Sequence, residues 1–290
     1  MILPVHVNQW RGASAVAGGP PPVTDGLISV YQFWNPDACV MNGQTFETML
    51  DQGPGGINGL YDLGLFGGTG PILLPAETPS GRDAALFDGT ALNAMSSEGP
   101  SGLGGEFSRT TDFVISISCA VYRMDGTGGF PPPGATGNKY FAGLGYSQSL
   151  TPHYGLVTRD ANACNAIGRW NSGTLYISQS TMNTDGWSAI TTTAEDRAGG
   201  LFQSIYTTDQ VPVIDRVSDS SPPPLGYLGV LNRFAIGASP RAYDTGSEQA
   251  SAGNVAHGYF KAVEFRVYDK YLSEEEAAQN QAYFHALMGI

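Results

Sequence analysis

The sequence predicts an all-β sandwich of two antiparallel sheets, with an extended N-terminal arm and a short C-terminal helix. Its 290 residues include 39 glycines and 19 prolines but only 14% charged residues, a composition typical of many turns and few exposed helices. Short alternating segments separated by turn signals follow one another along the chain. Hydrophobic residues make up 41% of the chain, enough for a substantial core. We expect an arm over residues 1–25 and one domain over residues 26–290.

The arm is defined by its composition. GASAVAGGPPPVTDG, which ends at residue 26, has the glycine and proline content of a linker. Arms of this kind either extend freely or pair with the edge strand of a neighbouring subunit. We expect the second arrangement, in a homo-oligomer.

The clearest internal strand is Asp112 to Arg123, where apolar residues alternate with small or polar ones. The face formed by Phe113, Ile115, Ile117, Cys119 and Val121 is predicted to line the core. The pattern predicts further strands at Lys139–Gly145, His153–Thr158, Ala166–Trp170, Thr174–Gln179, Trp187–Thr192, Gly200–Tyr206 and Arg233–Gly237.

The C-terminal segment combines a long strand with a helix. From Tyr259 to Tyr268 the residues alternate, and the odd-numbered face from Tyr259 to Val267 is the better core candidate. Ser273 precedes Glu276 by three residues, the spacing of a capping box, and Gly289 is the expected C-cap.

Four segments resemble the laminin-G-like type of concanavalin A-like jelly roll. EFRVYDKYLSEEEAAQNQAYFHALMG resembles its closing strand and helix, and GLISVYQFWNPDA its opening strand. MLDQGPGGINGLYDLG and AALFDGTALNAMS resemble the glycine-rich turn and the hairpin that follow. The resemblance spans about Gly26 to Ile290 and implies a jelly-roll sandwich. Such domains are most familiar from bacteriophage virion proteins.

The resemblance implies a non-catalytic virion structural protein on a phage exterior, as a tail, fibre or head-decoration subunit. The arm would contact other virion proteins, and loops on one rim would contact host surface glycans. The loop candidates are Met124–Asn138, Asp215–Gly226 and Ser239–Ala256. The alternatives are a purely structural decoration or tail subunit that binds no sugar, a free-standing carbohydrate-binding module, and a glycan hydrolase.

Charge and cysteine usage exclude several classes of protein. A net charge of −12 argues against nucleic acid and against an anionic membrane surface. No stretch approaches the roughly 18 apolar residues of a membrane span, and no signal peptide is recognisable. The three cysteines form neither a disulfide framework nor a zinc motif, so we expect synthesis in a reducing cytosol.

No catalytic motif is recognisable, so we expect no enzymatic activity. The chain lacks the closely spaced carboxylates that hydrolytic jelly rolls carry along one strand. Glu195 and Asp196 are adjacent, but we assign them to a turn.

Two loop clusters suit sugar binding, which requires a flat aromatic ring and fixed polar groups. The first cluster is Asn183, Asp185 and Trp187, and the second is Arg241, Tyr243 and Asp244. In the alternative interpretation Trp187 is a core residue of the strand that begins there.

Calcium is the only cofactor that the sequence suggests. RDANACN presents the oxygen donors of Asp160, Asn162 and Asn165, which a hard cation prefers. The alternative is an ordinary turn, because Asp and Asn are also favoured in turns without metal.

Overall fold

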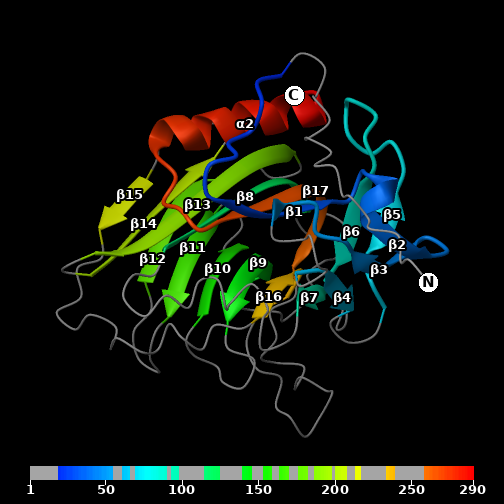
Figure 1. The fold of residues 1–290 in the computed structure, drawn as a ribbon, viewed down its shortest axis with the longest axis horizontal. Coiled ribbons are helices and arrows are strands. Elements are labelled where there is room, and N and C mark those ends of the chain that lie inside the picture. Colours follow the sequence, from blue (N-terminus) through cyan, green and yellow to red (C-terminus); the bar gives the residue numbers. More distant parts are fainter. Residues whose placement is uncertain are drawn as a thin grey trace, which may run out of the picture.

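The computed structural model gives the fold for the following parts of the chain: residues 19–54, 61–65, 69–89, 93–97, 114–124, 139–145, 153–158, 163–169, 176–181, 186–197, 200–207, 213–216, 233–238 and 258–290. In these residues, antiparallel strands form one continuous hydrogen-bonded sheet that curls into two facing layers, and a single α-helix follows them (Figure 1). The predicted β-sandwich with a C-terminal helix is therefore confirmed.

The first layer lies beneath the helix. Its strands are β1 (Leu27–Gln32), β6 (Ala84–Asp88), β8 (Val114–Arg123), β13 (Trp187–Arg197), β14 (Gly200–Thr207), β15 (Val213–Arg216) and β17 (Tyr259–Tyr268). Strand β17 pairs with β1 and β6 along one edge and with β8 along the other. From β8 the layer continues through β13 and β14 to β15.

The second layer faces the first across the core. Its strands are β4 (Leu63–Leu65), β7 (Met95–Ser97), β16 (Arg233–Ile236), β9 (Lys139–Gly145), β10 (His153–Thr158), β11 (Ala163–Arg169) and β12 (Tyr176–Thr181), in that spatial order. The layers are connected by β3 (Thr45–Met49) and β5 (Ile72–Leu74). Strand β2 (Cys39–Asn42), which follows the short 3-10 helix η1 (Pro36–Ala38), pairs with β3. Strand β3 pairs with both β4 and β5, and β5 pairs with β6, so the sheet turns the corner there.

Strand β13 corrects one expectation. Glu195 and Asp196 do not form a turn but continue β13 to Arg197, paired with Phe202 and Leu201 of β14. The pairing extends as far as Arg197, which lies opposite Gly200.

The core between the layers is built from alternating strand residues and aromatic rings. Ile115, Ile117, Cys119 and Val121 of β8 are fully buried in it, as the alternation predicts, while Phe113 lies outside the described residues. The ring of Phe33 packs edge-to-face against three other rings, those of Phe46, Phe87 and Phe265.

Strand β17 corrects a second expectation, because its core face changes partway along the strand. Phe260 and Ala262 lie in the core although the odd-numbered face was predicted there. A β-bulge between Ala262 and Glu264 shifts the register, so that Phe265 and Val267 point inward as predicted. Val263 faces the helix instead. A bulge adds one residue to one strand, which exchanges the two faces on either side of it.

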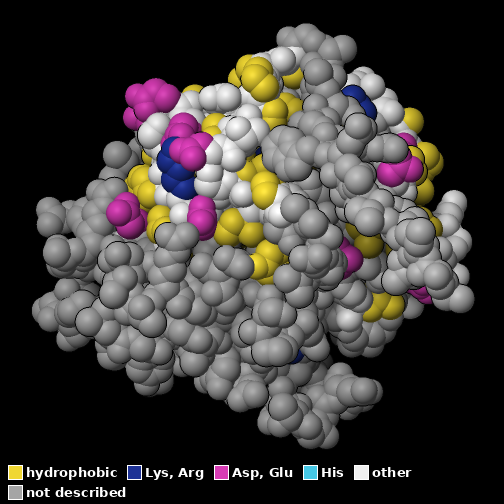
Figure 2. All heavy atoms as spheres, in the orientation of Figure 1, with side chains coloured by type: hydrophobic (Ala, Val, Ile, Leu, Met, Phe, Trp, Pro, Cys, Tyr) yellow, Lys and Arg dark blue, Asp and Glu magenta, His cyan; other side chains and the backbone are white. Residues whose placement is uncertain are grey.

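Helix α2 (Glu274–Met288) lies on the outer face of the first layer (Figure 1). Ser273 and Glu276 form the predicted capping box, and Gly289 ends the helix at φ 79°. The first turn carries three glutamates, and Lys270 contacts both Glu276 and Asp25 at 2.5 Å. Figure 2 shows this end of the helix as acidic side chains gathered around a basic one. No helix in the described part of the chain is long and apolar enough to cross a membrane.

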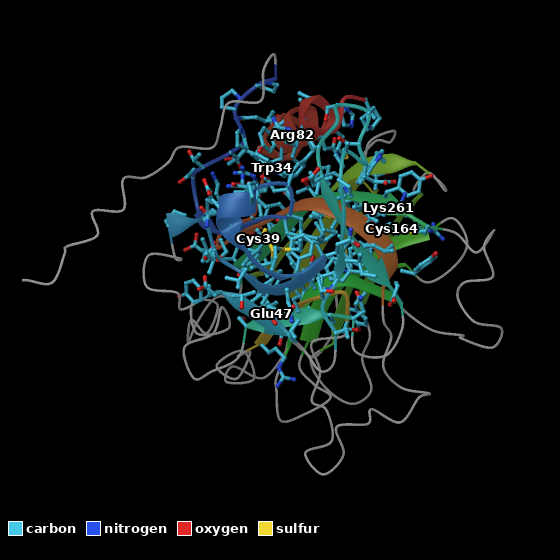
Figure 3. The ribbon with its side chains drawn as sticks, turned by 90° about the vertical axis from the view of Figure 1, so that its right-hand side faces the viewer. Trp34, Cys39, Glu47, Arg82, Cys164 and Lys261 are labelled. Atoms are coloured by element: carbon cyan, nitrogen blue, oxygen red, sulfur yellow. The ribbon has the colours of Figure 1, made fainter. Side chains whose placement is uncertain are left out.

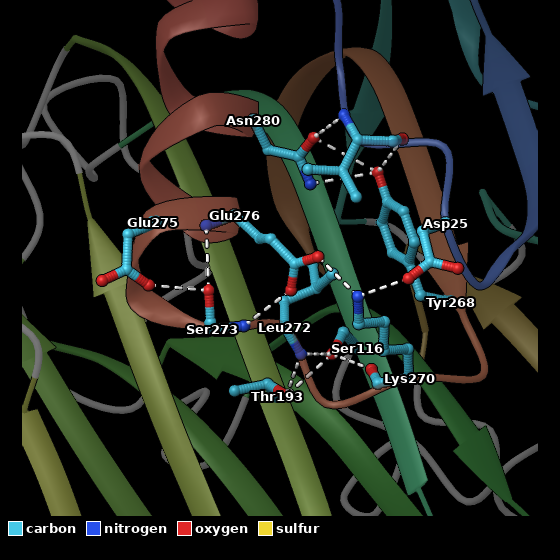
Figure 4. A network of polar contacts seen from close by, with 11 residues as sticks. Asp25, Ser116, Thr193, Tyr268, Lys270, Leu272, Ser273, Glu275, Glu276 and Asn280 are labelled. Carbon is cyan, nitrogen blue, oxygen red and sulfur yellow. Dashed lines mark hydrogen bonds and ion pairs between the residues drawn. The ribbon is translucent and has the colours of Figure 1, made fainter.

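Hydrogen bonds fasten the helix both to the sheet and to the end of the arm (Figure 4). The buried side chain of Asn280 accepts a hydrogen bond from the Val23 backbone N–H and donates to the hydroxyls of Ser118 and Tyr268. Residues 19–25 therefore run along the helix rather than away from it.

A buried carboxylate connects three elements beneath the helix. Glu264 of β17 is fully buried and accepts hydrogen bonds from Arg266 Nε at 2.6 Å and from the Tyr283 hydroxyl of α2 at 3.1 Å. It also accepts from Gln32 at the end of β1 and from the indole N–H of Trp34. All four donors converge on one charge, which fixes the helix, β1 and β17 relative to one another.

A second buried carboxylate positions the start of β1. Asp51 accepts hydrogen bonds from the backbone N–H groups of Val30 and Gly53 and from the Ser29 hydroxyl. Burial raises the pKa of Asp51 to about 6, although these three donors act in the opposite direction. The ionised form is therefore less favourable in the folded chain than in the unfolded one.

We predict that Glu264→Gln destabilises the fold by about 3–5 kcal/mol, because it leaves the buried Arg266 charge uncompensated. The matched control is Glu77→Gln, which breaks the half-exposed ion pair with Lys261 and is expected to cost at most about 1 kcal/mol. Chemical denaturation of the two variants measures both values. Equal losses would contradict the role assigned to Glu264.

We predict a pH dependence of stability that originates from Asp51. The pKa of Asp51 is raised in the folded state. The contribution of this side chain to the free energy of unfolding is therefore fully present below the unfolded-state pKa near 4, and it is lost as pH rises through about 6. Asp51→Asn is therefore expected to be relatively more stable at pH 7 than at pH 4, with a difference of about 2 kcal/mol relative to the parent chain. Denaturation at the two pH values measures this, with Glu47→Gln on β3 as the control. If the free energies of unfolding of the parent chain and of Asp51→Asn change equally between the two pH values, the pH dependence does not originate from Asp51.

Candidate functional site

A row of small residues crosses five adjacent strands on the outer face of the second layer. We call it the small-residue row; it consists of Gly64 on β4, Ser96 on β7, Ala235 on β16, Gly143 on β9 and Gly155 on β10. Each member is the direct cross-strand partner of the next. At about 4.8 Å between strands, the row is about 19 Å long.

The row faces away from the core because strand side chains alternate. Its neighbours in the chain point inward: Leu63, Met95, Phe234, Leu144 and Tyr154 all belong to the core cluster. Along this line the second layer therefore turns large side chains toward the interior and small ones toward its outer face.

The two ends of the row differ. At Gly64 a methyl group built on the glycine would meet nothing within 4 Å, and neighbouring Leu65 is 41% exposed. At Gly155 the same methyl group would lie 2.7 Å from the ring of Tyr140, which therefore closes that end. Between the ends the row is shielded, with Ser96 3% and Ala235 0% exposed.

Two polar side chains accompany the row. Among the described residues, the buried hydroxyl of Ser96 has no hydrogen-bond partner, an arrangement that is rare for buried polar atoms. Arg233 is 8% exposed and precedes Ala235 by two residues, which places it on the same face opposite Gly145. The site therefore combines a backbone that is open at Gly64 with one buried hydroxyl and one buried guanidinium.

The structure describes only part of the first predicted sugar cluster. Trp187 is 9% exposed and packs edge-to-face on Tyr122, in the apolar cluster beneath α2. Asn183 and Asp185 lie outside the described residues, so sugar binding by this cluster stays a prediction.

The other predicted residues also stay predictions. Arg241, Tyr243 and Asp244 lie outside the described residues, as do Asp160 and Asn162. The register places Asn165 in β11 between Val157 and Gln179. In the part of the chain with an assigned structure, no three His, Cys, Asp or Glu side chains are grouped as metal ligands would be.

Glu264 and Tyr283 do not form an open catalytic pair, although they are in hydrogen-bond contact. Both side chains are enclosed beneath α2, and burial raises the pKa of the Tyr283 hydroxyl well above its ordinary value. A substrate could reach neither group without displacing the helix, so their role is structural.

Comparison with known proteins gives matches of fold. The chain is similar to Trypanosoma rangeli sialidase in complex with sialic acid, with a TM-score of 0.53 and 12% identity over 94% of this chain and 36% of the sialidase chain. It is also similar to a mutant of that sialidase displaying trans-sialidase activity, with a TM-score of 0.51 and 14% identity over 95% and 35% of the two chains. A weaker similarity, with a TM-score of 0.42 and 12% identity, links 58% of this chain to 82% of the CBM40 of Ruminococcus gnavus IT-sialidase, bound to α2,3-sialyllactose. No family model and no curated protein sequence matches the chain.

These similarities correct the expected function. The prediction of a phage virion structural protein is wrong, because the similar structures are those of a sialidase and of its variant rather than of virion components. The exclusion of enzymatic activity is overturned as well, since the similar structures include a sialidase and a variant with trans-sialidase activity. The chain spans about a third of these sialidase chains, so what it shares with them is the fold.

We predict that the same substitution destabilises the fold at one glycine of the row and not at another. Gly155→Ala is expected to destabilise the fold by about 1–3 kcal/mol, because the methyl group collides with the Tyr140 ring. Gly64→Ala is expected to change stability by less than about 0.5 kcal/mol, because the space above it is open. Thermal or chemical denaturation compares the two. A larger loss for Gly64→Ala would contradict the open end of the row.

Proposed function

We propose that this chain recognises glycans, with the small-residue row as its binding surface. The observation that carries the proposal is the run from Gly64 to Gly143 together with the Ser96 hydroxyl, which has no hydrogen-bond partner in the described part of the chain. Glycine within a strand often marks a place where a ligand approaches the backbone closely. Sugar hydroxyls both donate and accept hydrogen bonds, so one of them would satisfy Ser96.

An acidic sugar suits the row better than a neutral one. Arg233 lies beside the row, and a guanidinium is the side chain best matched to a carboxylate. Trypanosoma rangeli sialidase has been solved with sialic acid, which carries such a carboxylate. Sialic-acid-terminated glycans are therefore the first ligands to test.

Hydrolysis of the same glycans is the second candidate, favoured by the similarity to sialidases. In most glycoside hydrolases the reaction uses two carboxyl groups about 5–10 Å apart, and sialidases instead use a tyrosine nucleophile. Both tyrosine and carboxylate residues are plentiful in the chain, so release of sialic acid is measured alongside binding.

Two predictions from the sequence are independent of the small-residue row. The loop at Asp160, Asn162 and Asn165 would hold calcium, and the arm over residues 1–25 would join copies of the chain into a homo-oligomer. Calcium titration and light scattering with and without the arm test them separately.

We predict that sialyllactose binds the parent chain and that Gly64→Trp weakens binding at least tenfold, because the indole covers the open end of the row. Gly64→Ala is the matched control and is expected to retain binding. Isothermal titration calorimetry measures both, and release of free sialic acid reports hydrolysis. If Gly64→Trp binds as tightly as the parent, the row is not the binding surface. If no glycan on a broad array binds the parent chain, the proposed function is wrong.

A further inference from the structure

Arg82 is held against an aromatic ring just before strand β6. Its guanidinium carbon lies 4.3 Å from the centroid of the Trp34 ring, and both side chains are half-buried. Figure 3 labels the two next to each other, on the side of the molecule that carries the β2–β3 hairpin. A guanidinium stacked on a ring loses rotational freedom, so its N–H groups point in restricted directions.

The ring beneath Arg82 is itself fixed from the other side. The indole N–H of Trp34 donates to Glu264 at 3.0 Å, and Glu264 is the buried carboxylate that also binds Arg266 and Tyr283. Trp34 also packs against the apolar cluster beneath α2. Its ring is therefore a rigid platform.

The backbone at Arg82 is equally constrained. The Arg82 N–H donates to the Thr78 hydroxyl at 2.8 Å, and the Thr78 N–H donates to the Arg82 carbonyl at 3.1 Å. Ser80, within the same turn, bonds through its hydroxyl and its N–H to the carbonyls of Leu287 and Met288. The turn is thus attached to the C-terminal end of α2.

The charge of Arg82 is not neutralised by any acidic side chain among the described residues. Three other basic residues are paired, as Lys261 with Glu77, Arg266 with Glu264, and Lys270 with Asp25 and Glu276. The adjacent Asp83 accepts a hydrogen bond from the Ala76 N–H. In a chain with net charge −12, a rigid and partly exposed guanidinium without a counter-ion is unusual.

We propose that Arg82, positioned by Trp34, is an oxyanion subsite that binds a carboxylate or a sulfate group. The planar fork of the guanidinium matches both anions through two parallel N–H···O hydrogen bonds. The subsite belongs to the edge of the first layer and the small-residue row to the second layer, so this site does not depend on the proposed glycan surface.

The indole N–H of Trp34 provides a local test. Chain labelled with ¹⁵N-tryptophan is titrated with sodium sulfate and, separately, with sodium glucuronate, at constant ionic strength balanced by sodium chloride. The Trp34 signal is assigned by its loss in Trp34→Phe. We expect a saturable shift of this signal in the parent chain, at least tenfold weaker apparent affinity in Arg82→Gln, and an intermediate affinity in Arg82→Lys, which keeps the charge but loses the fork.

Lys261→Gln is the control, since it removes one positive charge from a paired residue and is expected to leave the affinity unchanged. Gly64→Trp is likewise expected to bind sulfate normally, which separates this site from the small-residue row. The two titrations show which anion is preferred. A linear, non-saturating shift in the parent chain would overturn the proposal, as would unchanged affinity in Arg82→Gln or an equal loss in Lys261→Gln.

Discussion

The buried carboxylate of Glu264 is the interaction on which the arrangement of this fold depends. It lies where three elements meet that are distant in the sequence: the end of β1, the middle of β17 and the closing helix. A charge removed from water is tolerated only when several donors surround it, and here Gln32, Trp34, Arg266 and Tyr283 do so. The helix is consequently fixed at one position on the outer face of the first layer.

Because the helix lies on the first layer, the outer faces of the two layers differ. The first layer is covered by α2 and by residues 19–25, so its outer face is occupied along the helix. The second layer carries no helix in the described residues, and its outer face holds the small-residue row instead. The Glu264 interaction extends outward as well, because it fixes Trp34 and, through that ring, the guanidinium of Arg82.

Local sequence patterns predicted many of the helix and strand positions, whereas contacts between residues distant in the sequence could not be predicted from them. The capping box at Ser273 and the strand Lys139–Gly145 depend on neighbours in the chain and are confirmed. The bulge in β17 is set by pairing with β8, which alternation alone does not show. The same limit applies to the row, because Gly64 and Gly143 are far apart in the sequence and no local pattern shows that β7 and β16 bring their strands together. Short strands such as β4 and β7 give too little alternation to be recognised.

We propose that glycans bind on the outer face of the second layer. A crystal structure of the chain soaked with sialyllactose tests this proposal, because the electron density locates the sugar independently of any variant. We expect a sugar lying along the row, with one of its hydroxyls within hydrogen-bond distance of Ser96 Oγ and its carboxylate toward Arg233. Density for the sugar on any other face, with the row empty, would contradict it.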